Sequence, residues 1–231
     1  MSEKLILRPR LAAIADMVRS GCDLLLDIGT DHALLPTYLV LHGIVRSAVA
    51  SDIAQGPLQR AEGTVRQWGV ESSVQLHLGD GLSGLCAEGV TDIVIAGMGG
   101  EAIIDILNAA PFTKDPDIRL ILQPMTRADV LRKWLGENGY NILDERLCPE
   151  EEKLYQILLV SFDGIPRTPS AFCCAVGEKN LLHKDENLKL HLSRLKSVYL
   201  TRAAGKESAN QDASHERSIL CGIDAALEDN S

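Results

Sequence analysis

The sequence has no apolar run long enough to cross a bilayer, although hydrophobic residues make up 45% of its 231 positions. A membrane-spanning helix needs about 20 consecutive apolar residues. The first residues, Met1-Ser2-Glu3-Lys4, also lack the pattern of a secretory signal. We therefore expect a cytoplasmic protein with no membrane partner.

Metal-binding and redox motifs are absent as well. The six cysteines form no C-x-x-C pair and have no spacing typical of zinc ligands; they are Cys22, Cys86, Cys148, Cys173, Cys174 and Cys221. We interpret them as reduced thiols of a cytosolic protein that holds no metal ion.

The most informative stretch, Leu24–His32, has too few glycines for a dinucleotide fingerprint. A G-x-G-x-x-G turn brings bare backbone N–H groups to a pyrophosphate. Here only Gly29 is present, and Asp31 takes the place of the second glycine. A carboxylate there would repel a pyrophosphate but would favour a cationic centre, such as the sulfonium or ammonium of S-adenosylmethionine. The alternative is that Asp31 only caps the helix beginning at Ala33.

Apolar strands and amphipathic helices alternate around this turn. Strands are predicted at 24–28, 45–52, 73–78, 91–96, 118–123, 140–147 and 153–162. Helices are predicted at 8–20, from 33 to about 42, and at 57–68, 101–109 and 127–138. Five alternating units followed by a hairpin predict an α/β fold with a seven-stranded sheet, of the Rossmann-like class I methyltransferase type.

Several polar residues follow the predicted strands. Asp52 ends the second strand 23 residues after Gly29, where such sheets bind ribose hydroxyls; the alternative is a helix cap. Asp80 lies between Gly79 and Gly81, so it is placed to accept from an adenine amine, or it belongs to a turn only. Arg10, near the start of the first helix, is a candidate for binding a carboxylate, or is plain surface charge.

The sheet pattern ends at a linker, 164–170, which contains two prolines. We therefore predict a methyltransferase domain at 1–163 and a C-terminal helical domain at 171–231, with two amphipathic helices forming a coiled-coil-like hairpin. Residues 178–206 hold seven Lys or Arg and three Asp or Glu, a net charge of +4 in a chain of net charge −9. This segment is either a nucleic-acid contact or a solvated helix face. The candidate RNA-binding residues are Lys179, Lys184, Lys189, Arg194, Lys196 and Arg202.

Four motifs together resemble one bacterial family, the tRNA (adenine(22)-N1)-methyltransferases. They are Asp27-Ile-Gly-Thr-Asp-His-Ala-Leu-Leu-Pro36, Gly79-Asp-Gly-Leu82, Ile95-Ala-Gly-Met-Gly-Gly100 and Leu122-Gln-Pro124. The resemblance implies S-adenosylmethionine as methyl donor and an adenine in the D-arm of tRNA as acceptor. It also implies a Rossmann-like catalytic domain followed by a helical, coiled-coil-like domain.

Matched motif by motif, the resemblance also implies a set of cofactor residues. Those of the first motif are Asp27, Gly29, Asp31 and His32. Asp52 falls on the ribose position, and Asp80 and Gly81 fall on the adenine position. Ala96, Gly97 and Met98 line the edge where the methyl group is transferred.

The segment Gly97–Gly100 offers no side chain to accept from the amine of the target base. Asp31 is our candidate catalytic residue, because the first loop and the fourth-strand loop meet at the switch point of such a sheet. Three alternatives stay open: a methyltransferase with another acceptor, a non-catalytic nucleotide-binding or RNA-binding adaptor, and a nicotinamide-dependent dehydrogenase. We expect a monomer or weak dimer.

Overall fold

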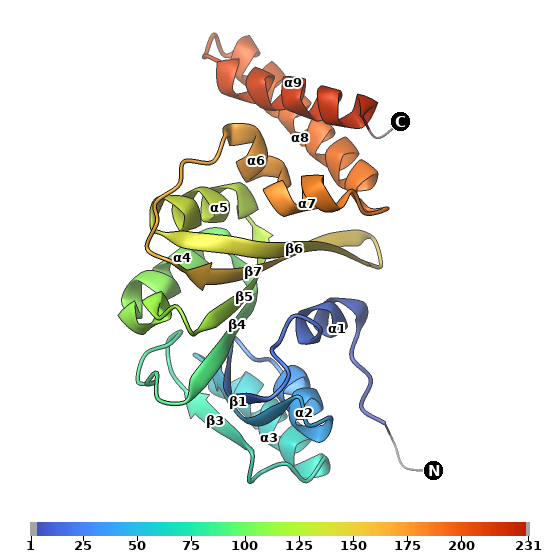
Figure 1. The fold of residues 1–231 in the computed structure, drawn as a ribbon. Helices are drawn as coiled ribbons and strands as arrows, with labels where there is room; N and C mark the ends of the chain where they lie inside the picture. The colour runs from blue at the N-terminus through green and yellow to red at the C-terminus, as the bar shows by residue number, and fades with distance from the viewer. Residues whose placement is uncertain (1–3, 230–231) are drawn as a thin grey trace.

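The computed structural model describes residues 4–229; residues 1–3, on which part of the signal-peptide expectation rests, and residues 230–231 lie outside that range. One seven-stranded sheet organises the chain, with the strand order β3-β2-β1-β4-β5-β7-β6 (Figure 1). Its strands are β1 (Cys22–Ile28), β2 (Val45–Asp52), β3 (Val74–Leu78), β4 (Val90–Gly99), β5 (Arg119–Thr126), β6 (Tyr140–Glu150) and β7 (Lys153–Phe162). The first five strands are parallel, and β7 is antiparallel to both β5 and β6.

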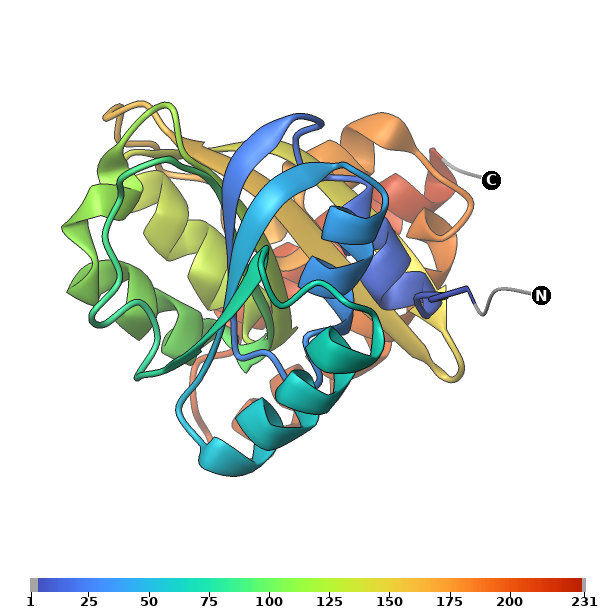
Figure 2. The same ribbon diagram turned by 90° about the horizontal axis from the view of Figure 1, so that it is seen from below.

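Helices cover both faces of the sheet (Figure 2). They are α1 (Pro9–Ala15), α2 (Leu34–Leu41), α3 (Gln55–Gln67), α4 (Gly100–Ala109), α5 (Ala128–Glu137) and the 3₁₀ turn η1 (Pro111–Lys114). Residues of α4 and α5 pack on one face, and residues of α1 and α2 pack on the other. Central strands buried on both faces must be apolar throughout, which explains the run Ile93-Val94-Ile95, fully buried in β4. The predicted seven-stranded α/β fold is confirmed.

Four predicted boundaries in this domain are wrong by three residues or more. Strand β4 runs to Gly99 rather than to residue 96, and β6 runs to Glu150 rather than to residue 147. The first helix does not reach residue 20 but ends at Ala15, and Met17 and Val18 bury their side chains from a turn. The fifth strand does not end at Pro124 but runs to Thr126. Proline is tolerated there because β7 pairs with β5 only as far as Leu122, so the missing N–H of Pro124 is not needed on that side.

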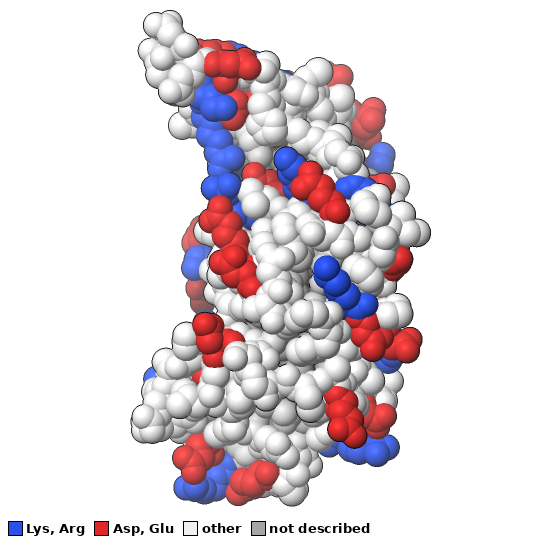
Figure 3. Space-filling model, turned by 90° about the vertical axis from the view of Figure 1, so that its left-hand side faces the viewer, with Lys and Arg blue, Asp and Glu red and all other residues white. Residues whose placement is uncertain are grey.

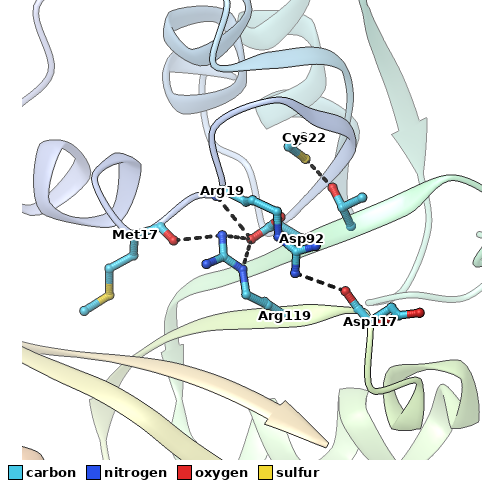
Figure 4. Close-up of polar contacts among 7 residues, drawn as sticks. Met17, Arg19, Cys22, Asp92, Asp117 and Arg119 are labelled. Atoms are coloured by element: carbon cyan, nitrogen blue, oxygen red, sulfur yellow. Dashed lines mark hydrogen bonds and ion pairs between the residues drawn. The ribbon is translucent and has the colours of Figure 1, made fainter.

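A partly buried ion pair joins the segment after α1 to the amino ends of the central strands (Figure 4). The guanidinium of Arg119 in β5 donates to the carboxylate of Asp92 in β4 at 2.7 Å and to the carbonyl of Met17 at 3.3 Å. The backbone N–H of Arg19 donates to the same carboxylate at 3.4 Å. Nearby, burial raises the pKa of the Cys22 thiol to about 11. These contacts fix α1 against the sheet and so help to place Arg10.

The C-terminal region contains α6 (Ala171–Val176), α7 (Glu178–His183), α8 (Leu188–Ser208) and α9 (Ser214–Glu228). The long helices α8 and α9 lie beside each other beyond the β6 edge (Figure 1). The expected hairpin is therefore present, but two further helices precede it. The stretch predicted as its first helix is interrupted at Lys184, whose φ of +49° is incompatible with a continuing right-handed helix. Within residues 4–229 no helix is long and apolar enough to span a membrane.

The C-terminal helices have their own apolar cluster, but it includes Leu147 of β6. Polar contacts join the same regions. Buried Arg132 of α5 donates to Glu145 of β6 at 2.6 Å and to the carbonyl of Cys174 in α6 at 3.0 Å. The backbone N–H of Lys179 in α7 donates to the other oxygen of Glu145 at 3.0 Å. Helix α7 is thus bonded directly to β6, and α6 is joined to it through Arg132 of α5.

Candidate active site

Two cavities open at the carboxyl ends of the strands, where the chain reverses between β1 and β4. Such a switch point is the usual ligand-binding crevice of an open α/β sheet. The Asp27 cavity, of about 540 Å³, is lined by Arg10, Asp27, Asp31, His32, Ala96 and Gly97. The Asp52 cavity, of about 560 Å³, is lined by Asp52, Asp80, Gly81, Met98 and Ile106. Gly29 lines both, so the two cavities meet at the turn after β1.

Gly29 is required at this junction for two reasons. Its φ is +79°, a conformation that side chains rarely adopt, and a Cβ there would lie 2.2 Å from Cε of Met98. Strand β2 also holds the turn, because the N–H groups of Gly29 and Thr30 both donate to the carbonyl of Ser51, at 2.8 and 3.0 Å. The close approach of Met98 places its thioether between the two cavities.

Asp27 is a buried carboxyl group at the end of β1. Desolvation raises its pKa to about 6, and a hydrogen bond from Thr30 and the charge of Arg10 oppose that rise. Burial of an ionised carboxylate is costly unless a cation or hydrogen-bond donor compensates. The Asp27 cavity therefore favours a ligand that brings a positive charge to this carboxylate.

Arg10 carries positive charge into the same cavity from α1. Its backbone N–H donates to Oε2 of Glu150 at 2.8 Å, and its Nη1 donates to Oε1 of Gln123 at 2.9 Å. The guanidinium also lies over the ring of Tyr155, 5.4 Å from its centroid. Arg10 and Asp27 together make the cavity suitable for a group with both an anionic and a cationic end.

Asp31 does not cap α2, so that alternative interpretation is wrong. The N-cap is Ala33, with a φ of +50°, and its N–H donates to the hydroxyl of Thr30 at 3.1 Å. The Asp31 carboxylate is instead 65% exposed at the rim of the Asp27 cavity. It accepts a hydrogen bond from Arg60 of α3 and lies 3.4 Å from Nε2 of His32.

Asp52 does not cap α3, whose N-cap is Ala54 with no side-chain hydrogen bond, so that alternative is wrong and ribose binding stays a prediction. Its Oδ1 accepts from the N–H of Ala54 at 2.7 Å, which stabilises the turn before α3. The residue also lines the Asp52 cavity beside Asp80 and Gly81, which lie after β3. The parallel strands β2 and β3 bring these acidic residues to one edge although 28 positions separate them.

Every residue predicted to bind the cofactor lines one of the two cavities. Three residues that the sequence interpretation missed form hydrogen bonds with residues lining the Asp27 cavity: Thr30, Arg60 and Gln123. Gln123 had a recognisable signal, because it is a lone amide in the apolar strand Leu120-Ile121-Leu122. The sequence gives no such signal for Arg60, because only the fold brings α3 close to the loop after β1.

The structure does not bring the six predicted RNA-binding residues onto one face. At 100° per residue, Lys189 and Lys196 share one side of α8, whereas Arg194 and Arg202 lie toward the other. Lys196 forms an ion pair of 2.7 Å with Asp224 of α9, Arg194 donates to the carbonyl of Glu152, and Arg202 lies over the ring of Tyr199. Basic side chains also form a short stripe toward the C-terminal end of one face, whereas both signs are mixed elsewhere on it (Figure 3).

Among residues 4–229 there is no group of three or more His, Cys, Asp or Glu side chains that would hold a metal ion.

Comparison with known proteins gives a consistent assignment. Residues 7–158 match the family described as a methyltransferase domain. The chain is 36% identical over 169 residues to the tRNA (adenine(22)-N(1))-methyltransferase of Bacillus subtilis, covering 70% of this chain and 71% of that protein.

Solved structures agree over almost the whole chain. A Streptococcus pneumoniae protein in complex with S-adenosyl-L-methionine is 31% identical, with a TM-score of 0.81 over 96% of this chain and 100% of its own. The Bacillus subtilis m1A22 tRNA methyltransferase TrmK is 29% identical, with a TM-score of 0.80 over 97% of both chains. With the cavities at the switch point and the four motifs around them, these similarities show that the chain belongs to the tRNA (adenine(22)-N1)-methyltransferase family.

Proposed function

We propose that this protein transfers a methyl group from S-adenosylmethionine to N1 of adenine 22 in the D-arm of tRNA. One observation carries the proposal: two cavities joined at Gly29, one with opposite charges facing each other and one lined by carboxylates and glycines. The donor has the same two parts, a zwitterionic amino acid and a nucleoside. The relatives that match over most of the chain support the acceptor.

The residues present fit the donor. In the Asp27 cavity, Asp27 is suited to the α-ammonium and Arg10 to the α-carboxylate. In the Asp52 cavity, Asp52 has an oxygen besides the one bonded to Ala54 and is suited to ribose hydroxyls. Asp80 and Gly81 are suited to the adenine. The remaining predicted cofactor residues, His32, Ala96, Gly97 and Met98, border the junction and the Asp27 cavity.

The donor, when bound, supplies the electrophilic methyl group. N1 of adenine has an in-plane lone pair, so the protein's main task is to orient the base. Gly97–Gly99 leaves the backbone accessible but gives no side-chain acceptor for the N6 amine. Asp31, exposed at the cavity rim and held by Arg60, is therefore our candidate to accept from that amine. Its charge would also stabilise the positive charge that develops on the methylated base.

The C-terminal helices are our candidate for the tRNA-binding surface. The turn between β6 and β7 connects them to the site, because Glu150 accepts from Arg10 while the carbonyl of Glu152 accepts from Arg194 of α8. Lys179, Lys184 and Lys189 are near this connection in sequence, and among the described residues their ammonium groups form no ion pair. RNA held by phosphate contacts on α7 and α8 would thus approach on the side of the Asp27 cavity.

We place the boundary between the catalytic and helical domains at residues 164–170, as the sequence predicts. We also expect the protein to act in the cytoplasm as a monomer or weak dimer. Because α6 is bonded to α5 and α7 is bonded to β6, we expect the two domains to move together.

The test is mass spectrometry of nucleosides after incubating the protein and S-adenosylmethionine with a tRNA transcript that has adenine at position 22. A matched transcript with guanine 22 is the control. A 1-methyladenosine peak with the first transcript alone is expected. A peak with both transcripts would reject position 22. Cofactor binding without any methylated nucleoside would favour another acceptor or a non-catalytic adaptor.

A further inference from the structure

Gln123 is a polar side chain in a place where the fold otherwise buries apolar ones. It lies near the carboxyl end of β5, is fully buried, and follows three apolar residues of the central sheet. Burying an amide is unfavourable unless its groups are hydrogen-bonded. The hydrogen-bond partners of Gln123 therefore indicate why an amide is present there.

Both ends of the Gln123 amide are bonded, and the partners define its orientation. Oε1 accepts from Nη1 of Arg10 at 2.9 Å, whereas Nε2 donates to the carbonyl of Pro124 at 3.1 Å and to Sδ of Met125 at 3.5 Å. A guanidinium can only donate and a carbonyl can only accept. Rotating the amide by 180° would therefore break both bonds. Glutamine is suited to this position because it presents an acceptor on one side and a donor on the other.

The bond to Arg10 leads directly into the Asp27 cavity. Arg10 is a long side chain from a short helix, and its guanidinium has further N–H groups beyond the one bonded to Gln123. Ring stacking on Tyr155 restrains the guanidinium plane, and the bond to Gln123 restrains its rotation within that plane. Arg10 and Asp27 line the same cavity, so the remaining donors are available to a ligand bound there.

We propose that Gln123 is a positioning residue that orients the Arg10 guanidinium for the α-carboxylate of the cofactor. This inference rests on the proposed function, since it takes S-adenosylmethionine as the ligand of the two cavities. It assigns to Gln123 an effect on only one end of that ligand. Recognition of the nucleoside end, in the Asp52 cavity, does not pass through Arg10.

Two product-like ligands separate the two ends. S-adenosylhomocysteine has both the amino acid and the nucleoside, whereas 5′-methylthioadenosine lacks the amino acid. Binding of each is measured by isothermal titration calorimetry to the full-length wild-type protein and to Gln123→Met, Arg10→Ala and the double variant. Gln123→Met keeps the volume of the side chain and removes both amide groups. Thr113→Val is the matched control, because it removes another buried hydrogen bond, to Tyr140, away from both cavities.

Gln123→Met should weaken binding of S-adenosylhomocysteine about tenfold, since an ordered hydrogen bond to a charged group is at stake, and leave 5′-methylthioadenosine within about twofold. Arg10→Ala should weaken S-adenosylhomocysteine at least as much, and adding Gln123→Met to it should cause no further loss, because the effect passes through Arg10. Thr113→Val should change neither affinity. If Gln123→Met does not fold, Gln123→Asn, which keeps the amide but shortens its reach, carries the same expectation.

The outcomes distinguish this inference from the proposed function. If the wild-type protein binds neither ligand, the proposed function fails. If it binds both, and Gln123→Met loses equal affinity for the two ligands or loses none, the positioning role is wrong and the proposed function stands. A further loss in the double variant, beyond that of Arg10→Ala, would also overturn the positioning role.

Discussion

Arg132 and Glu145 form an ion pair of 2.6 Å in which 2% and 1% of the two side chains are exposed. Helix α5 supplies the arginine and β6 the glutamate, and both residues also bond to the helices that follow the linker. A buried pair of this kind is strongly coupled, because removing one partner leaves a desolvated charge unmatched. The pair is thus a fully buried polar connection between the sheet domain and the C-terminal helices.

Glu145→Gln should therefore lower the free energy of unfolding by about 3 kcal/mol, measured by urea denaturation. Glu137→Gln is the control, because Glu137 forms only an exposed pair with Lys133 at 3.9 Å and should cost well under 1 kcal/mol. A loss for Glu145→Gln no greater than for the control would show that the pair contributes nothing to stability.

The buried carboxyl of Asp27 should lower the stability of the ligand-free protein at neutral pH while it strengthens cofactor binding. Its folded pKa of about 6 lies above the ordinary pKa of 3.8 for this group, so the ligand-free protein gains stability from this group below pH 3.8 and loses it as the pH rises through 6. Asp27→Asn should therefore raise the free energy of unfolding at pH 8 by about 2 kcal/mol and change it little at pH 4. The same variant should bind S-adenosylhomocysteine much more weakly. Equal stability changes at both pH values would contradict this origin.

His191 of α8 predicts the opposite pH dependence. Desolvation and the charge of Arg132 lower its pKa to about 4 from 6.5, although its bond to the carbonyl of Val176 opposes the shift. Since the unfolded chain binds a proton at higher pH than the folded one, this stability is present above pH 6.5 and lost as the pH falls to 4. His191→Gln should flatten the fall in melting temperature between these values. His215→Gln, at an exposed position, should not.

Asp31 should affect the chemical step more than cofactor binding. Asp31→Asn keeps the size of the side chain but removes its charge, and we expect kcat to fall about 100-fold while the affinity for S-adenosylhomocysteine changes less than about threefold. Arg60→Gln, which removes the partner of Asp31, should show a smaller loss of kcat. Unchanged kcat in Asp31→Asn, with weaker cofactor binding, would make Asp31 a cofactor residue only.

The lysines of α7 and α8 should bind tRNA through phosphates. Single substitutions Lys179→Ala, Lys184→Ala and Lys189→Ala should each weaken tRNA binding and lower the slope of log K against log salt by about 1. Lys196→Ala should have less effect, because that ammonium is paired with Asp224. Lys114→Ala, in the η1 turn of the sheet domain, is a control with the same charge change. An equal slope in all variants would remove this surface from tRNA binding.

Much of the site could be predicted because it follows local patterns. Asp27, Gly29 and Asp31 stand in one strand–turn–helix unit, and Asp52 and Asp80 follow the next two strands, whose parallel pairing brings them to one edge. The alternative prediction that Asp31 caps α2 is wrong, because the N–H of Ala33 donates to the hydroxyl of Thr30 instead. Which side chain of a turn accepts from a backbone N–H depends on the backbone geometry, and the apolar periodicity of the sequence does not predict that geometry.

The sequence by itself determined the α/β class, the number of strands and the family, because apolar periodicity and glycine-containing turns act over a few residues. Only the tertiary structure decided the contacts between residues that are far apart in the sequence. Gln123 accepts a hydrogen bond from Arg10, which is 113 positions away in the sequence, and Asp31 accepts one from Arg60 of α3. The basic residues of α8 lie on two different sides of that helix. Such contacts depend on how whole elements pack, so their residues need share no pattern along the chain.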